Sequence, residues 1–161
     1  MIGVKAGPSS PTATAEIDPY IALTVNWPIG RRGDALNLFV QDPDQGYVEL
    51  SVDSRTGELF HFVVIDEPQS VEPRADASPV PVHQSSVIVD RRLWPWKVTP
   101  DYTEPSNRAA DLTMPLRMTS DGQSTAVWFS QSPVAEYFIA GTVRVGATAH
   151  GELAVIDAAF R

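Results

Sequence analysis

Apolar and polar residues alternate along much of this chain with a period of two, the period of a β-strand that buries one face. The first alternating segment is residues 20–27, with its apolar side at Ile21, Leu23, Val25 and Trp27. Pro28 ends this strand because proline has no backbone N–H to give to a sheet. Clusters of turn-forming residues separate three further predicted strands, at residues 36–40, 47–52 and 58–65.

The second half of the chain repeats the alternation. Its first alternating segment is residues 112–118, with Leu112, Met114, Leu116 and Met118 on one side, and strands are also predicted at 125–130 and 152–160. Residues 133–140 allow two interpretations. They form either a strand or a short helix, capped by Ser132, with Pro133 in its first turn and Gly141 at its end. If they form a helix, residues 142–145 take the place of the strand at 47–52.

Two parts of the chain share a pattern of identical residues. Phe, Gln, Pro and Tyr at positions 39, 41, 43 and 47 recur 90 residues later, and Gly57-Glu58-Leu59 recurs 94 residues later. The alternation at 21–27 returns at 112–118, a spacing of 91 residues. This pattern predicts two similar four-stranded meanders related by a pseudo-two-fold axis. In the alternative, two unrelated meanders look alike because strands and turns favour the same residue types.

No segment has an apolar stripe at helical spacing over three turns, so the predicted fold is mainly β. We expect an antiparallel sandwich or barrel of about eight or nine strands, with at most one or two short helices. Residues 1–19 have few large apolar side chains and are predicted to form a flexible arm. Residues 20–161 are predicted to form a single β domain. Its two meanders, at 20–66 and 112–161, flank a proline-rich connector at 67–111 with a short strand at Val87-Ile88-Val89.

The composition narrows the classes of function. Among 161 residues, 20 Asp and Glu outweigh 12 Lys and Arg, a formal net charge of −8. We expect no nucleic-acid partner, because phosphate binding needs clustered basic side chains. The absence of cysteine excludes disulfides and thiolate chemistry and favours a reducing, cytoplasmic location. No apolar run is long enough for a signal peptide or a membrane span, so we expect neither export nor a membrane partner.

Candidate catalytic and metal-ligating residues are few. His61, His83 and His150 fall in a strand, in the connector and in a turn, and no spacing between them marks a shared site. Asp42-x-Asp44-x-Gly46 has the spacing that opens a calcium loop but lacks the later ligands, so a plain turn is favoured. We therefore expect no catalytic residue, no metal and no cofactor.

The leading functional hypothesis is a non-enzymatic binding module, of an inhibitor or immunity type, that engages a basic protein through an acidic face. The predicted face consists of Asp42, Asp44, Glu49, Asp53 and Glu58. A second candidate binding element is the basic and aromatic cluster of the connector, with Arg91, Arg92, Trp94 and Trp96. Its tryptophans either anchor a partner or fold down to close one end of the β structure.

Two alternative functions belong to other classes. A β-barrel carrier would hold a small apolar or aromatic ligand, with the lining Trp27, Phe39, Tyr47, Phe62, Trp128 and Phe129. An enzyme would need one of the three histidines to meet a carboxylate in a cleft. The predicted strand at 60–65 is apolar on both faces, so it either lies between two layers or faces a second subunit in a homodimer.

Overall fold

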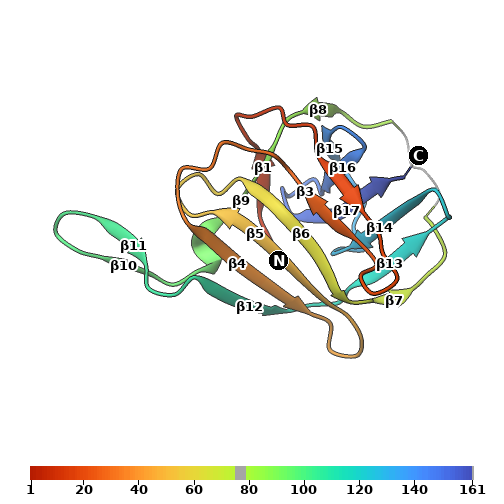
Figure 1. Cartoon of the computed structure of the whole chain (residues 1–161), viewed down its shortest axis with the longest axis horizontal. Helices are drawn as coiled ribbons and strands as arrows, with labels where there is room; N and C mark the ends of the chain where they lie inside the picture. Colours follow the sequence, from red (N-terminus) through yellow and green to blue (C-terminus); the bar gives the residue numbers. More distant parts are fainter. Residues whose placement is uncertain (75–78, 161) are drawn as a thin grey trace.

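The chain forms two β-sheets that pack face to face (Figure 1), as seen in a computed structural model that describes residues 1–74 and 79–160. Within these residues the six-stranded sheet has the order β12 (Ala109–Thr113), β4 (Ala35–Gln41), β5 (Tyr47–Asp53), β6 (Leu59–Asp66), β3 (Thr24–Asn26) and β2 (Thr14–Glu16). The seven-stranded sheet has the order β7 (Gln69–Ser70), β13 (Arg117–Ser120), β14 (Ser124–Trp128), β17 (Leu153–Ala159), β16 (Val143–Ala147), β15 (Glu136–Ala140) and β8 (Val82–Gln84).

Smaller elements complete the part of the chain that the structure describes. They are the pair β1 (Val4–Ala6) and β9 (Val87–Val89), the hairpin β10 (Trp96–Val98) and β11 (Thr103–Pro105), and the 3-10 helix η1 (Arg91–Leu93). The predicted fold class is confirmed, because the protein is mainly β and sandwich-like, but the two sheets contain thirteen strands among the described residues and not the predicted eight or nine. The barrel alternative is wrong, since the six-stranded sheet ends at β12 and β2 instead of closing.

The hydrophobic core lies between the two sheets. Alternate residues of the six-stranded sheet, among them Leu38, Leu50 and Phe62, have no exposed surface. They meet buried residues of the seven-stranded sheet such as Ile156, and the rings of Phe62 and Phe129 pack edge to face with centroids 6.2 Å apart. Apolar burial contributes roughly 25 cal/mol per Å², so this continuous core is the main source of stability.

The two sheets repeat one strand order. The six-stranded sheet runs β12-β4-β5-β6-β3-β2, and the seven-stranded sheet runs β8-β15-β16-β17-β14-β13 before its last strand, β7. In both sheets the first of these pairs is parallel and the next four are antiparallel. Residues 14–66 and 117–159 are therefore two units of the same topology.

The equivalence extends to a β-bulge in each unit. The register between β5 and β6 shifts at Phe60, and the register between β16 and β17 shifts at Ala154. The carbonyl oxygen of Phe60 accepts a hydrogen bond from Trp27 N at 2.9 Å, and that of Ala154 accepts one from Phe129 N at 2.8 Å. Bulges are local devices that re-aim a strand, so their recurrence at one place supports the internal pseudo-symmetry.

The predicted residue correspondence between the two units is only partly right. The spacing of 94 residues at Gly57-Glu58-Leu59 is correct, and Gly57 and Gly151 both have a positive φ, of 77° and 73°. The spacing of 90 residues is wrong because it matches β4 to β14, whereas β4 takes the place of β15. Neither unit is a four-stranded meander, because the last strand of each unit returns to pair with an earlier one, β6 with β3 and β17 with β14.

Residues 112–118 do not form the single strand that their alternation predicts. They are split between β12 of the six-stranded sheet and β13 of the seven-stranded sheet. Pro115 lies between the two strands, where it has no N–H to continue a ladder. The chain crosses from one sheet to the other here, and Leu116 N donates to the carboxylate of Asp42 at 2.6 Å.

Residues 1–19 are not the flexible arm that the sequence predicts. β1 pairs with β9, and β2 forms an edge of the six-stranded sheet. Ile2 is 1% exposed and Ala13 4% exposed, and Gly7 N donates to Ser86 O at 2.8 Å. The prediction failed because it counted apolar side chains, whereas the backbone of this segment is ordered by hydrogen bonds to strands distant in sequence.

The ambiguous segment at 133–140 is resolved by the pairing of its backbone. Residues 136–140 form β15, which pairs with β16 on one side and with β8 on the other. The strand interpretation is therefore right and the helix is wrong, because two partner strands satisfy more backbone groups than one isolated helical turn. The helix alternative also placed residues 142–145 in the position of the strand at 47–52. That part is close to the structure, since β16, at residues 143–147, takes the place of β5.

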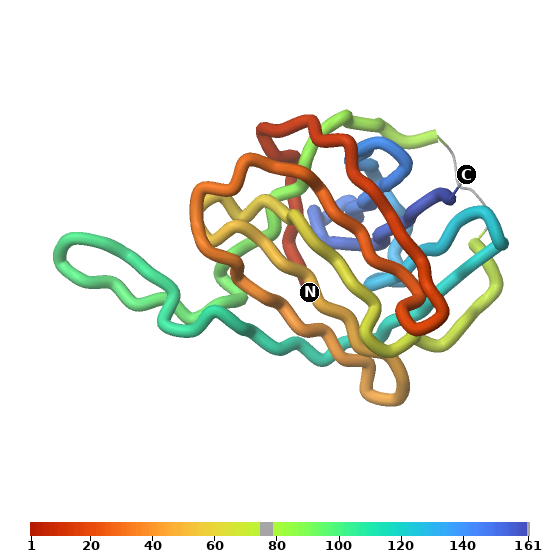
Figure 2. The backbone as a smooth tube through the Cα atoms, viewed as in Figure 1, coloured from red at the N-terminus to blue at the C-terminus, as the bar shows by residue number. Residues whose placement is uncertain are grey.

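The proline-rich connector contains more structure than predicted. Its predicted strand at 87–89 is confirmed as β9, but β7, β8 and β12 also add to the edges of the two sheets. Prolines are tolerated beside such edges, where one side of the strand needs no partner. The β10–β11 hairpin stands away from the rest of the molecule (Figure 2).

The strand that is apolar on both faces is β6, which lies inside the six-stranded sheet between β5 and β3. Phe62 and Val64 point into the core, while Val63 is half-buried and Ile65 is exposed on the other face. The homodimer stays a prediction.

Candidate functional site

Three of the five carboxylates in the predicted acidic face are buried. Asp42, Asp53 and Glu58 are 4%, 0% and 3% exposed, and each accepts hydrogen bonds from other parts of the chain. They cannot meet a partner, so their assignment to a binding face is wrong. The physical reason is that Asp in a turn accepts hydrogen bonds from the N–H groups of its own loop, and turn residues therefore do not always face solvent.

Asp53 joins two loops at one end of the six-stranded sheet. Its Oδ2 accepts hydrogen bonds from Arg32 N at 2.7 Å and Gly33 N at 3.0 Å, and its Oδ1 accepts from Arg55 N at 2.8 Å and Thr56 N at 3.0 Å. Burial raises the pKa of this carboxyl group, but the four N–H donors outweigh burial and lower the pKa to about 2. Asp53 is therefore a structural carboxylate that is charged at neutral pH.

Asp42 joins the two sheets. Its Oδ1 accepts from Asp44 N at 2.7 Å and Gln45 N at 3.1 Å, and its Oδ2 accepts from Leu116 N at 2.6 Å and from the Arg117 guanidinium at 3.2 Å. Burial raises the pKa of Asp42, but these donors, Leu116 N foremost, lower it below its usual value. The predicted turn at 42–46 is confirmed, and its carboxylate fixes the place where the chain changes sheets.

The remaining carboxylates of the predicted face lie in different settings. Glu58 accepts a hydrogen bond from the Ser86 hydroxyl at 2.7 Å and so ties β6 to the connector. Asp44 is exposed in the turn between β4 and β5. Glu49 is half-buried on β5, between the buried residues Val48 and Leu50, so its side chain points away from the core. Of the five predicted residues, Glu49 is the one that belongs to an outward sheet face.

The tryptophans of the connector fold onto the sandwich. Trp94 is 1% exposed, and its Nε1 donates to Asn37 O on β4 at 3.1 Å. Trp96 is half-buried, and its Nε1 donates to Arg91 O at 2.8 Å. Trp94 therefore closes one end of the β structure, the second of the two predicted alternatives.

The two arginines of the same cluster are bonded within the chain. Arg91 donates to two loop carbonyls at 2.7 Å, and Arg92 pairs with Asp90 at 2.6 Å. Together with Lys5 and His150 they line a hollow of about 520 Å³ beside the β1–β9 pair. Asp90 neutralises Arg92, whereas Arg91 is bonded to neutral carbonyl oxygens, so the lining keeps a positive charge and its guanidinium donors are largely used within the chain.

The six aromatic residues of the carrier hypothesis do not line one space. Trp27, Phe62 and Phe129 are buried members of the packed core. The other three lie partly exposed outside it: Phe39, Tyr47 and Trp128. The predicted common lining is therefore wrong, because alternate residues of a strand point to opposite faces of a sheet.

The three histidines do not converge. His61 Nδ1 lies 2.8 Å from Asn26 Oδ1 on the six-stranded sheet, and His83 Nε2 lies 3.1 Å from Glu136 Oε2 at the β8 edge of the other sheet. His150 is in the loop before β17. The His83–Glu136 pair lies at the surface, with 47% of the His83 side chain exposed. Among residues 1–74 and 79–160, no group of three or more His, Asp or Glu side chains is placed to hold a metal ion.

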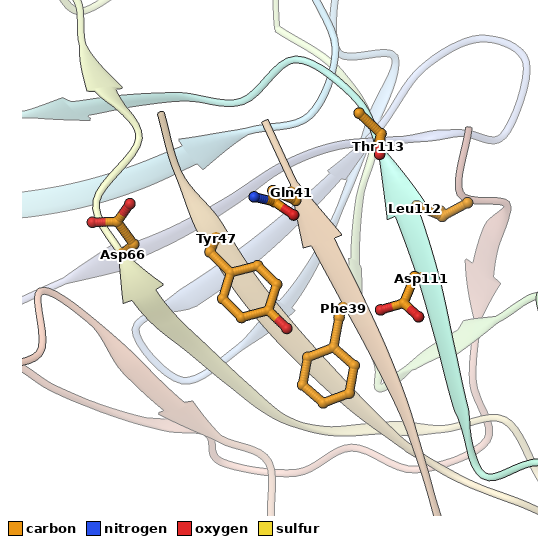
Figure 3. A pocket seen from close by; sticks show the side chains of 7 residues that line it. All are labelled: Phe39, Gln41, Tyr47, Asp66, Asp111, Leu112 and Thr113. Atoms are coloured by element: carbon orange, nitrogen blue, oxygen red, sulfur yellow. The ribbon is translucent and has the colours of Figure 1, made fainter. Parts of the chain in front are cut away.

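The outer face of the six-stranded sheet contains a hollow of about 390 Å³ (Figure 3). Phe39 and Tyr47 stack beside each other in it, with ring centroids 5.8 Å apart and 13° between the planes. The carboxylates of Asp66 and Asp111 lie on either side of this aromatic pair. The hollow therefore combines two aromatic rings with two acidic groups.

Strand register extends this surface beyond the hollow. Asp111, Phe39 and Glu49 are neighbours in one row across β12, β4 and β5, and the same row continues through β6 and β3 to Glu16 on β2. Phe39 and Glu49 point outward because the residues beside them in each strand are buried in the core. The row thus places outward carboxylates on β12, β5 and β2, with Phe39, Val63 and Thr24 between them.

No basic side chain balances these carboxylates within the sheet. The six strands β12, β4, β5, β6, β3 and β2 contain neither Lys nor Arg. Four Arg side chains of the described residues lie over aromatic rings, but none lies over Phe39 or Tyr47. This face therefore offers acceptors and aromatic surface without a cation from its own strands.

No protein-family model and no curated protein matches the chain. In the described part of the chain, no helix has the length and apolar character needed to cross a membrane.

Proposed function

We propose that this protein is a non-enzymatic binding module that engages a basic protein partner through the outer face of its six-stranded sheet. We call this surface the acidic face and define it by Glu16, Glu49, Asp66 and Asp111 with the aromatic pair Phe39 and Tyr47. The observation that carries the proposal is the set of outward carboxylates on β2, β5, β6 and β12, in a sheet whose six strands contain no Lys or Arg. An inhibitor or immunity-type role in the cytoplasm is one form of this function, and the absence of cysteine suits it.

The arrangement suits recognition of a basic surface for two physical reasons. Carboxylates of one sign on a rigid sheet attract an oppositely charged partner before contact and fix its orientation after contact. The half-buried rings of Phe39 and Tyr47 add contact area at a low entropy cost, since their side chains are already packed against each other. The long-range part of this attraction is screened by salt, because the Debye length is about 8 Å at physiological ionic strength.

Charge reversal on the acidic face tests the proposal. We expect Glu49→Arg to weaken retention of basic proteins from a native lysate by roughly tenfold or more, because a like charge replaces an attractive one. The equivalent position of the seven-stranded sheet holds an arginine, Arg144, so an outward arginine is compatible with this position of the fold. Bound proteins are identified by mass spectrometry and eluted in a salt gradient, and the partner should elute as the salt concentration rises.

The matched control is Asp101→Arg, which makes the same charge change at an exposed residue in the tip of the β10–β11 hairpin. It should retain the partner as the wild-type protein does. If Glu49→Arg and Asp101→Arg retain the same proteins, or if the retained proteins are not basic, the acidic face is not the binding surface.

A further inference from the structure

The second unit of the chain contains an arginine where the acidic face has Glu49. Glu49 lies between Phe39 and Val63 in the register of its sheet, and Arg144 occupies the same place in the seven-stranded sheet. The residue that takes the place of Val63 is Asp157. The pseudo-symmetry therefore allows one outer face to be compared directly with the other.

Arg144 shows how this type of sheet face holds a guanidinium group. Its Nε donates to Asp157 Oδ2 at 3.0 Å, and its Nη2 bonds the same oxygen. Its guanidinium carbon lies 4.6 Å from the ring centroid of Tyr137. On the outer face of the seven-stranded sheet, an aromatic ring and a carboxylate thus hold an arginine from the same chain.

The acidic face has the same two kinds of group, a carboxylate and an aromatic ring, with no arginine or lysine in its strands. We propose that the hollow between Asp66 and Asp111 receives an arginine side chain of the partner, with its guanidinium stacked on Phe39 and Tyr47. This inference rests on the proposed function and names the side chain that the acidic face recognises. Arg144 shows the kind of contact and not its position, because in strand register Tyr137 and Asp157 take the places of Asn37 and Val63.

The chemistry of the hollow favours arginine over lysine and over an uncharged polyol. Asp66 and Asp111 are acceptors on two sides of an aromatic pair. A guanidinium has five N–H donors and no acceptor, and its plane can stack on an aromatic ring while its edge donates to the carboxylate on one side. An ammonium group is a compact charge without a plane to stack. A polyol brings as many acceptors as donors, and carboxylates have no donor to offer those acceptors.

An NMR titration of the isotope-labelled full chain tests the inference. The probes are two capped pentapeptides with Ser and Gly around one central residue, either arginine or lysine. We expect the arginine peptide to shift the amide signals of β4, β5 and β12 and to bind at least fivefold more tightly than the lysine peptide. Asp111→Asn and Tyr47→Leu should each weaken arginine binding at least fivefold, while Asp101→Asn at the hairpin tip should leave it unchanged.

The outcomes separate this inference from the proposed function. Equal binding of the two peptides at the acidic face overturns arginine selectivity and leaves a general basic partner. Failure of the arginine peptide to bind, while Glu49→Arg still releases basic proteins in the lysate experiment, places the partner's contact outside the hollow and overturns the inference alone. Arginine-induced shifts that persist in both Asp111→Asn and Tyr47→Leu also overturn it. Failure of the arginine peptide to bind, together with equal retention of lysate proteins by Glu49→Arg and Asp101→Arg, removes the proposed function as well.

Discussion

Replacing Trp94 with alanine should lower the free energy of unfolding by about 3–5 kcal/mol, the range for removing a large aromatic side chain from a core. Trp94 is among the largest side chains with almost no exposed surface, and it closes the end of the sandwich next to β4. The substitution both opens a cavity and leaves Asn37 O without its indole donor. Urea unfolding followed by far-ultraviolet circular dichroism measures the change without relying on tryptophan fluorescence.

Two further variants separate the contributions at Trp94. Trp94→Phe keeps a ring in the cavity but loses the indole N–H, so it should cost less than the alanine variant. Tyr102→Ala removes an aromatic side chain that is 57% exposed at the β10–β11 hairpin, and it should change stability by about 0.5 kcal/mol or less. If Trp94→Ala is as mild as Tyr102→Ala, Trp94 does not close the core.

The fold class could be predicted because the alternation of side chains survives wherever one face of a strand is buried. It succeeded for β4 and β5, while β6, β14 and β17, which also lie inside the two sheets, were predicted from apolar runs bounded by turn residues. It failed for β1, β2, β7, β8 and β12, which lie at edges or in the small β1–β9 pair. Those strands are short and owe their conformation to backbone pairing with distant segments, so their side chains show no clear period.

The internal duplication shows the limit of residue identity as a guide. Gly57 and Gly151 keep their place because each loop needs a positive φ that glycine adopts without strain. The loops between the preceding strands differ in length, so the spacing that relates β6 to β17 does not relate β4 to β15. The identities at a spacing of 90 residues match β4 to β14, two strands with different neighbours, and reflect shared strand and turn composition.

The candidate site was only partly accessible from the sequence. Parity alone places Phe39 and Glu49 outward, since Leu38, Val40 and Leu50 must face the core. Asp111 could not be assigned to the same face, because its strand joins β4 in a parallel pair after a long connector. The absence of Lys and Arg from this sheet could be recognised only once its six strands were known.

Asp53→Asn should lower the free energy of unfolding by about 2–4 kcal/mol near neutral pH, since hydrogen bonds to charged groups contribute roughly 1.5–3 kcal/mol each and an amide can keep only part of them. The carboxylate accepts four backbone N–H bonds, two on each oxygen, from the loops at 32–33 and 55–56. In the variant, the amide NH₂ faces two of these donors. Asp44→Asn, at an exposed residue, is the control and should change stability by about 0.5 kcal/mol or less.

The pH dependence of stability in the wild type and in Asp53→Asn tests whether loss of the buried charge causes the destabilisation. The pKa of Asp53 is lowered from 3.8 to about 2 in the folded protein. The charged carboxylate therefore stabilises the fold fully at pH values above 3.8, and this stabilisation is lost as the pH falls through about 2. The stability gap between wild type and Asp53→Asn should therefore narrow by about 2 kcal/mol between pH 6 and pH 2. Urea midpoints measured across this range report the gap. A gap that stays constant with pH would show that the variant acts through loop packing and not through the buried charge.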